Sequence, residues 1–279
     1  MYMKITDILR ERYPRRLELA RHFSEAVGDN ATIEALTRVQ VHKLGDYLTA
    51  NMSRNSARTY LAMFKSAIRL YDQQGIVKDA TLSAAVRSED TISVYLTNDE
   101  IGMIEDYALI ADGERLWYAL HFLISAYTGC RASDVCQLKE ENIINGCVTY
   151  VSKKTGVRAQ IPMKIGLDKW VHQVHTMRAS GGYTFSINSY NILIKKICRD
   201  AGINSEVKVH TGGKDKIGRK WMYVSSHTAR RSFASNLYIK GCDITSIAIM
   251  MGHRKPEMTY RYLCCGLRSM DDSIMSFFK

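Results

Sequence analysis

The sequence predicts a mainly α protein, with an N-terminal helical region and a larger α-rich region that contains a small antiparallel β-sheet. Three observations support this fold class. The 279 residues include only three prolines, so helices can continue without interruption over most of the chain. Apolar residues recur at helical spacing in several separate segments. One further segment has the composition of a β-hairpin.

The first 80 residues contain three segments with helical spacing, "ITDILRERYPRRLELARHFSEAVG", "TRVQVHKLGDYLTA" and "SARTYLAMFKSAIRLYDQQG". The stretch "VRSEDTISVYLTNDE" has no helical period. We therefore expect a helical domain at residues 1–80, a linker at 81–95 and a second domain at 96–279, whose C-terminal tail covers 263–279.

The second domain is expected to begin with a helix at "LTNDEIGMIEDYA", because Thr97 and Glu100 form the pattern of a capping box. Another helix, "RLWYALHFLISAYTG", is predicted to stop at Gly129. The β-rich segment "GCVTYVSKKTGVRAQIPM" is interrupted at Lys154-Thr155-Gly156 and predicts a hairpin. A short strand-like "KWMYV" precedes two more predicted helices, "SSHTARRSFASNLYIKG" and "DITSIAIMMG".

Composition favours a polyanionic partner. The chain carries 39 Lys and Arg against 28 Asp and Glu, a net charge of +11, and a basic balance of this size favours nucleic acid. The seven cysteines form no C-x-x-C pair, and an odd number does not suit a disulfide framework, so we expect reduced thiols in a cytoplasmic protein. No apolar run approaches the roughly 18 residues of a membrane span, and the N-terminus lacks the apolar core of a signal peptide.

Four separated segments carry polar residues that the local structure does not require. Arg131 lies at an expected helix junction, and Lys154 lies at the expected hairpin tip. His227 and Arg230 are three residues apart at the start of a helix and share one face. His253 follows a helix end. Taken singly, each has an ordinary explanation, such as capping, helix termination or exposure to solvent.

In their order along the chain, "TGCRASDVCQL", "SKKTGVRAQIP", "HTARRSF" and "MGHRKPEMTYRY" resemble the sequence boxes of the tyrosine recombinase (phage integrase) family. The pattern of that family is an Arg, a hairpin Lys, H-x-x-R, a His or Trp, and a nucleophilic Tyr nine residues later. The resemblance covers residues from about 95 to 265, and more weakly 1–80. It implies a short integrase, with a SAM-like helical core-binding domain and a catalytic domain that has the fold of DNA breaking-rejoining enzymes. The matching positions are Arg131, Lys154, His227, Arg230, His253 and Tyr262.

The resemblance implies that Tyr262 attacks a DNA phosphodiester and forms a 3′-phosphotyrosine link. Such a link conserves the bond energy, so rejoining needs neither ATP nor a metal, and we expect no cofactor. Arg131 and Arg230 are expected to hold the phosphate through bidentate contacts. Asp134, one helical turn after Arg131, is expected to support that arginine.

The resemblance also indicates which residues are expected to transfer protons. Lys154 is expected to protonate the leaving 5′-oxygen, with its neighbour Lys153 as the alternative. A tyrosine phenol in water keeps its proton up to about pH 10, so it must lose that proton as it attacks. His227 is expected to accept or position this proton. His253 is expected to donate a hydrogen bond to a phosphate oxygen.

Two tyrosines, Tyr260 and Tyr262, compete for the role of nucleophile. Pro256 suits the first turn of a helix that contains both. At about 100° per residue, side chains two residues apart on a helix point about 200° apart, so one tyrosine would face the site. The spacing of nine residues from His253 selects Tyr262.

Two basic segments are expected to contact DNA phosphates outside the catalytic set. One lies in the third predicted helix, and the other, "GGKDKIGRK", precedes the H-x-x-R helix. The expected contacts are Arg54, Asn55, Arg58, Lys65, Lys214, Lys216, Arg219 and Lys220.

The expected function is that of a site-specific DNA recombinase, acting at the nucleoid in the cytoplasm. Its expected partners are double-stranded DNA recombination sites and further copies of itself in a synaptic tetramer; an accessory directionality factor stays open. Two alternatives also stay open, DNA relaxation like that of a type IB topoisomerase and a DNA-binding regulator without catalysis. No carboxylate cluster accompanies the boxes, and His172 and His175 are expected on a solvated helix face, so no metal site is predicted.

The tail "LRSMDDSIMSFFK" contains an apolar cluster, and burying one Phe contributes about 1.5–3 kcal/mol. We therefore expect the tail to dock, either on its own domain or in a neighbouring protomer, as tails do in this family. We favour the neighbouring protomer because recombination requires coupling between protomers. The cluster consists of Ile274, Met275, Phe277 and Phe278.

Overall fold

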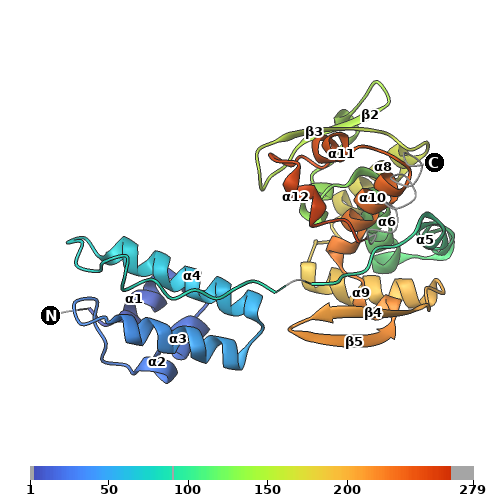
Figure 1. Cartoon of the computed structure of the whole chain (residues 1–279). Helices are drawn as coiled ribbons and strands as arrows, with labels where there is room; N and C mark the ends of the chain where they lie inside the picture. The colour runs from blue at the N-terminus through green and yellow to red at the C-terminus, as the bar shows by residue number, and fades with distance from the viewer. Residues whose placement is uncertain (1–2, 90, 265–279) are drawn as a thin grey trace, which may run out of the picture. The chain divides into compact units, whose positions relative to one another are not determined.

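The structure is a computed structural model that describes residues 3–89 and 91–264. These residues form two compact units, which Figure 1 shows with their helices and strands labelled. The first unit runs as far as Thr91 and includes His210–Asp215, and the second comprises Ile92–Val209 and the chain from Lys216 onward. Within the described residues, no helix is both long enough and apolar enough to cross a membrane.

Four helices form the first unit, around a core in which the buried rings of Phe23 and Phe64 stack at 5.3 Å. The first of the three predicted helical segments is divided at Pro14, because a proline lacks the N–H that an inner helical turn needs. The helices are α1 (Ile5–Arg12), α2 (Glu18–Val27), α3 (Arg38–Asn51) and α4 (Arg54–Tyr71).

The chain after α4 packs against this first unit. Leu82 and Ala84 are buried in its core, and the Lys65 ammonium donates a hydrogen bond to the Ala84 carbonyl. The side chain of Asn55 and the backbone of Glu89 exchange two hydrogen bonds of 3.0 and 3.2 Å. The N-terminal unit therefore continues beyond residue 80, into the stretch that the sequence predicts as a linker.

Helix α6 (Gly113–Thr128) is the centre of the second unit. Its residues from Trp117 to Ala126 are buried, as expected of a helix that is apolar around its whole circumference. Helix α10 packs along it, and α5, α8 and α9 also contact it. The other helices of this unit are α5 (Asn98–Ile110), α7 (Ala132–Val135), α8 (Leu167–Ala179), α9 (Ile187–Asp200), α10 (Ser226–Ile239), α11 (Ile244–Met250) and α12 (Glu257–Tyr260).

Two predicted helix signals are confirmed in this unit. Helix α5 begins with a capping box in which the Thr97 hydroxyl accepts from the Glu100 N–H, and the Glu100 carboxylate accepts from the Thr97 N–H. Helix α6 ends at Gly129, which adopts the left-handed conformation with φ of 65°. Both signals are local, because they depend on residues within one turn of the helix end.

The predicted hairpin is also confirmed. Strands β1 (Ile143–Ile144), β2 (Cys147–Val151) and β3 (Arg158–Pro162) form one antiparallel sheet in the order β1-β2-β3 after a short 3-10 helix at Glu140–Asn142. Between β2 and β3, the turn is closed by a hydrogen bond of 2.9 Å from the Ser152 N–H to the Val157 carbonyl.

A second, two-stranded sheet was not predicted. It consists of β4 (Glu206–Thr211) and β5 (Lys214–Arg219), and β5 is mostly exposed and charged, which hides the alternation of a strand. The strand-like "KWMYV" was interpreted wrongly, because it forms a 3-10 helix at Lys220–Tyr223. A short apolar run does not by itself distinguish a strand from a buried helical turn.

We predict that Gly129→Ala destabilises the protein more than Gly146→Ala. Both glycines have positive φ, of 65° and 73°, so each alanine carries a conformational cost of about 1–2 kcal/mol. A Cβ at Gly129 would also lie 2.6 Å from Cδ1 of Phe233 in α10, whereas a Cβ at Gly146 meets nothing within 4 Å. This clash adds about 1–3 kcal/mol. Urea unfolding of both variants measures the difference, and equal losses would contradict the close packing of α6 on α10.

Candidate active site

Arg131 is positioned by the end of α6 and the start of α7. It directly precedes α7 in an extended conformation, and its side chain is 11% exposed. Its Nη1 donates a hydrogen bond of 2.7 Å to Oγ of Ser152, in the β2–β3 turn. The Asp134 carboxylate lies 3.8 Å from the same nitrogen. Arg131 therefore reaches its acidic neighbour mainly through the serine hydroxyl.

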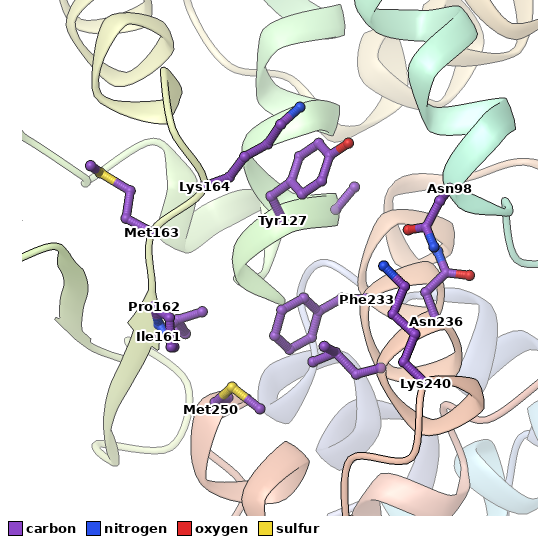
Figure 2. Close-up of a pocket in the computed structure, with 12 residues that line it drawn as sticks. Asn98, Tyr127, Ile161, Pro162, Met163, Lys164, Phe233, Asn236, Lys240 and Met250 are labelled. Carbon is purple, nitrogen blue, oxygen red and sulfur yellow. The ribbon is translucent and has the colours of Figure 1, made fainter.

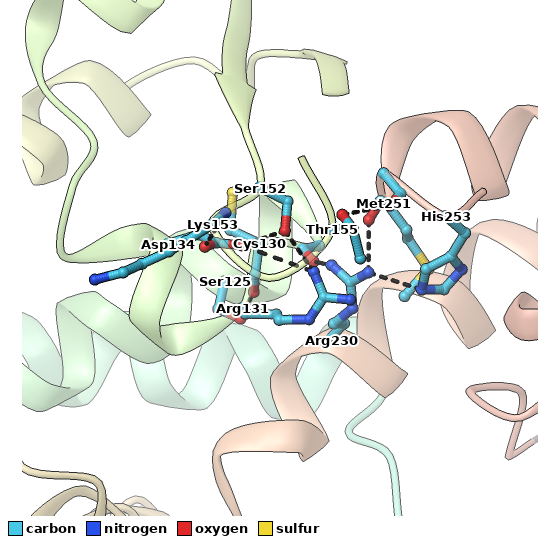
Figure 3. Close-up of polar contacts among 12 residues, drawn as sticks. Ser125, Cys130, Arg131, Asp134, Ser152, Lys153, Thr155, Arg230, Met251 and His253 are labelled. Atoms are coloured by element: carbon cyan, nitrogen blue, oxygen red, sulfur yellow. Dashed lines mark hydrogen bonds and ion pairs between the residues drawn. The ribbon is translucent and has the colours of Figure 1, made fainter. Parts of the chain in front are cut away.

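Arg230 is the most deeply buried charged side chain in the site, at 1% exposure. Its Nη1 donates to the Gly129 carbonyl, and its Nη2 donates to the Met251 carbonyl at 2.5 Å (Figure 3). Its Nε is buried and has no hydrogen-bond partner among the described residues. A buried guanidinium with an unused donor is suited to an anionic ligand.

His253 is held between Arg230 and Thr259. Nη2 of Arg230 lies 2.8 Å from Nε2 of His253, and Oγ1 of Thr259 lies 2.9 Å from Nδ1. Because arginine can only donate, Nε2 must be the acceptor, and the ring proton is on Nδ1. Burial, followed by the charges of Arg230 and Arg131, lowers the pKa of His253 to about 4.

This arrangement differs from the role that the sequence suggested for His253. Both ring nitrogens are engaged within the protein, and neutral His253 has no second N–H to offer a phosphate. In the structure, His253 contacts Arg230 and Thr259, and its contact with a phosphate stays a prediction.

Tyr262 lies beyond the helix that was predicted to contain it. Helix α12 ends at Tyr260, so the argument from helical geometry does not apply and the prediction of one helix through both tyrosines is wrong. The surroundings nevertheless separate the two residues. Tyr260 is 57% exposed, whereas Tyr262 is half-buried and the guanidinium carbon of Arg230 lies 5.2 Å from its ring centroid.

A cavity of about 300 Å³ collects the predicted residues. Lys154 reaches it from the β2–β3 turn, and His227 reaches it from the first turn of α10. His253 is the one residue of the six predicted catalytic residues that does not line the cavity. It contacts the ring of Tyr262, and the two ring centroids lie 5.2 Å apart. The cavity is lined by Arg131, Ala132, Ser133, Lys154, Phe185, Ile187, Ser226, His227, Arg230 and Tyr262.

Burial and nearby positive charge both lower the pKa of His227. Its pKa is lowered from the ordinary value, first because its ring is partly desolvated against the cavity wall and then because Arg231, Arg230 and Lys154 are near. The neutral imidazole is therefore favoured, as a proton acceptor requires. None of the residues that line the cavity is acidic.

The predicted DNA contacts outside the cavity fall into two groups. Arg54, Arg58, Lys214, Lys216 and Arg219 are exposed. Of these, Arg219 also donates a hydrogen bond of 3.1 Å to the Asn204 carbonyl. The other three are less exposed and have partners within the protein: Asn55 is bonded to Glu89, Lys65 to the Ala84 carbonyl, and Lys220 is buried in an ion pair with Glu100.

Lys220 is the clearest departure from the predicted contacts. Its side chain is 11% exposed, and the Glu100 carboxylate compensates the charge of its ammonium. It is therefore not free to contact a DNA phosphate from this position. This pairing could not be predicted from local sequence, because Glu100 lies 120 residues away along the chain.

His172 and His175, which were expected on a solvated helix face, both lie on α8. His172 contacts the Glu140 carboxylate, and both side chains are largely exposed. Among the described residues, no group of three or more His, Cys, Asp or Glu is arranged to hold a metal ion.

A second hollow, of about 310 Å³, lies elsewhere in the same unit (Figure 2). Its wall is largely apolar, and Lys164 and Lys240 are among its polar lining residues. The Lys164 ammonium contacts Glu105 and lies 4.1 Å from the ring centroid of Tyr127. The apolar lining residues are Ala126, Ile161, Pro162, Met163, Phe233, Leu237 and Met250.

Sequence reasoning missed the side chains that hold the catalytic set in place. Ser152 bridges Arg131 and Asp134, Thr259 contacts His253, and Arg254 donates to the Thr155 carbonyl at 2.9 Å. Serine and threonine at these positions have no distinctive spacing, so no sequence signal identifies them.

Comparison with known proteins identifies the family of the chain. The model of the phage integrase family matches residues 95–264. An integrase of Escherichia phage P2 is 24% identical over 192 residues, which are 68% of this chain and 48% of that relative. The chain thus spans about half the length of this curated relative.

Solved structures share the fold at low sequence identity. A lambda integrase tetramer bound to a Holliday junction has a TM-score of 0.66 at 17% identity, covering 94% of this chain and 78% of that one. The integrase of transposon Tn1549, in complex with a circular intermediate DNA, has a TM-score of 0.68 at 14% identity, covering 98% and 99%. The family model matches more than half of this chain, and the solved structures share its fold. The chain therefore belongs to the phage integrase family.

Proposed function

We propose that this protein is a site-specific DNA recombinase, which cuts and rejoins DNA strands through a 3′-phosphotyrosine intermediate on Tyr262. The observation that carries the proposal is the cavity, in which two guanidinium groups, a lysine, a histidine and a tyrosine converge without any acidic lining residue. Such a set suits a phosphodiester, because its charges match the negative phosphate oxygens.

In the proposed cleavage step, the phenol oxygen of Tyr262 attacks phosphorus and the bond from phosphorus to the 5′-oxygen breaks. His227 accepts the phenol proton, and Lys154 gives a proton to the departing 5′-oxygen. Arg131 and Arg230 hold the non-bridging oxygens, and the unused Nε of Arg230 supplies one donor. Rejoining is the reverse of these steps, with a 5′-hydroxyl as the nucleophile.

The fixed orientation of Arg230 supports the proposal energetically. Two carbonyl groups and His253 hold its terminal nitrogens before any ligand arrives. A donor that is already oriented needs no reorganisation as charge develops, and loss of one such donor typically costs about 2.7–4 kcal/mol of transition-state stabilisation.

The proposed assembly is a synaptic tetramer on DNA. It is supported by the structural likeness to lambda integrase, which has been solved as a tetramer bound to a Holliday junction. A type IB topoisomerase would relax DNA as a single protomer, so strand exchange between two sites separates that alternative from recombination.

Residues 265–279 of the C-terminal tail lie outside the described residues. We propose that its apolar cluster, which follows Asp271 and Asp272 in the sequence, occupies the second hollow of a neighbouring protomer (Figure 2). The apolar lining matches the cluster, and the charge of Lys240 suits the two aspartates, whereas Lys164 is already paired with Glu105.

The first prediction concerns the nucleophile. Tyr262→Phe is expected to bind DNA but form no covalent adduct, because it lacks the attacking oxygen, whereas Tyr260→Phe is expected to keep the adduct. A nicked substrate that traps the intermediate, incubated in EDTA and analysed on a denaturing gel, measures this. An adduct that persists in Tyr262→Phe would exclude the assignment, and absence of any adduct in the unmodified protein would favour a non-catalytic regulator.

The second prediction concerns pH. Because the pKa of His227 lies below its ordinary value of about 6.5, the active neutral form is retained as pH falls from 8 to about 6.5. The single-turnover cleavage rate at saturating DNA should therefore keep more than half of its pH 8 value at pH 6.5 and decline further at lower pH. His227→Gln should be slower and should lose this acidic decline. A rate that already halves between pH 8 and pH 7 would contradict the role of His227 as the base.

The third prediction concerns assembly. Deletion of residues 270–279 and the charge reversal Lys240→Glu are both expected to leave binding to a single site nearly unchanged and to reduce higher-order complexes and strand exchange. Lys169→Glu, an equal charge change at an exposed lysine outside the hollow, is the matched control. Native gels with one and two sites measure both steps. Normal strand exchange by the truncated protein would show that the tail is not needed for assembly.

A further inference from the structure

The turn that carries Lys154 is attached to the protein on both sides of that lysine. The Lys153 N–H donates a hydrogen bond of 3.2 Å to Oδ1 of Asp134. The Thr155 carbonyl accepts a hydrogen bond of 2.9 Å from Arg254, beside His253. Lys154 itself is exposed, and its long side chain is flexible. The position of its ammonium therefore depends on how firmly the backbone of the turn is held.

Ser152 makes the most deeply buried of these attachments. It is fully buried, its Oγ accepts from Nη1 of Arg131 at 2.7 Å, and the same oxygen donates to Oδ2 of Asp134 at 3.1 Å (Figure 3). Its backbone N–H closes the turn onto the Val157 carbonyl. One hydroxyl thus connects an arginine of the phosphate site with the turn that carries the lysine.

The two oxygens of Asp134 both hold this turn. Oδ2 accepts from the Ser152 hydroxyl and Oδ1 accepts from the Lys153 N–H, and the carboxylate is almost fully buried. Asp134 was expected to support the site of Arg131, and it lies 3.8 Å from Nη1 of that arginine, an ion-pair distance. Its hydrogen bonds go to the turn.

We propose that Ser152 is a positioning residue for Lys154, because it fixes the turn to Asp134 and Arg131 and so keeps the proton donor aligned with the bound phosphate. This inference rests on the proposed function, in which Lys154 protonates the leaving 5′-oxygen. A serine hydroxyl suits the position because it accepts and donates at once. Alanine loses both bonds and leaves a buried carboxylate oxygen without its donor.

A substrate with a sulfur atom in place of the bridging 5′-oxygen tests the inference. The bond from phosphorus to sulfur breaks as the tyrosine bond forms, and the 5′-thiolate departs without needing a proton. A variant that fails because Lys154 is misplaced should therefore recover on this substrate. A variant that fails because the protein is less stable, or because Arg131 is misplaced, should not.

We expect Ser152→Ala to slow single-turnover cleavage of ordinary DNA by about 10- to 100-fold, as loss of a residue that orients a catalytic group typically does. On the sulfur substrate, it should cleave within about threefold of the unmodified protein. Lys154→Ala should show the same recovery. The double variant should be no slower on ordinary DNA than Lys154→Ala, because both changes remove the same contribution, the protonation of the leaving 5′-oxygen by Lys154.

Ser232→Ala is the matched control. Ser232 is also fully buried, and its hydroxyl likewise accepts one hydrogen bond, from the Leu96 N–H, and donates another, to the Thr228 carbonyl. Whatever rate it loses on ordinary DNA should also be lost on the sulfur substrate. Circular dichroism and thermal unfolding of each variant report folding. If Ser152→Ala does not fold, Ser152→Cys, which has a similar size and a weaker donor, replaces it.

The outcomes distinguish the inference from the proposed function. If sulfur rescues Lys154→Ala but not the Ser152 variant, Ser152 acts through Arg131 or stability and the inference is overturned. If sulfur does not rescue Lys154→Ala, and rescues Lys153→Ala instead, the assignment of the general acid is wrong. Recovery of both the Ser152 variant and Lys154→Ala supports the inference.

Discussion

The buried guanidinium of Arg230 is the interaction on which the rest of the site depends. Removing such a charge from water is costly unless its donors are satisfied. Here the carbonyls of Gly129 and Met251, together with His253, meet that requirement. These partners come from the end of α6 and from the segment after α11, so satisfying one arginine of α10 brings three distant parts of the chain together. The cavity is a consequence of that convergence.

A site built around cations also sets the protonation of its histidines. The charges of Arg230 and its neighbours lower the pKa of both His227 and His253 after burial has already done so. Both rings are therefore kept neutral, but their uses differ, because His253 is engaged on both nitrogens while His227 lines the cavity. The same positive charges that suit a phosphate also favour the neutral form of His227.

Features set by short-range physics were predictable from the sequence, and features set by tertiary partners were not. The Thr97 capping box, the stop at Gly129 and the β2–β3 hairpin depend on a few adjacent residues, and all are confirmed. The burial of Lys220 against Glu100 and the strand pairing of the charged segment at β5 depend on groups far along the chain. Neither feature can be recognised from the residues adjacent to it in the sequence.

The spacing between His253 and Tyr262 remained informative although the helix expected to explain it ends too early. Thr259 gives the physical reason. Its hydroxyl contacts Nδ1 of His253, and its carbonyl accepts the Tyr262 N–H at 2.8 Å. Ser235 in α10 donates to the carbonyl of Tyr262. Hydrogen bonds therefore hold both ends of the segment 253–262 against the elements that position Arg230. A residue added or lost within the segment would move the phenol away from the cavity. A fixed number of residues acts here as a distance constraint, which does not require regular secondary structure.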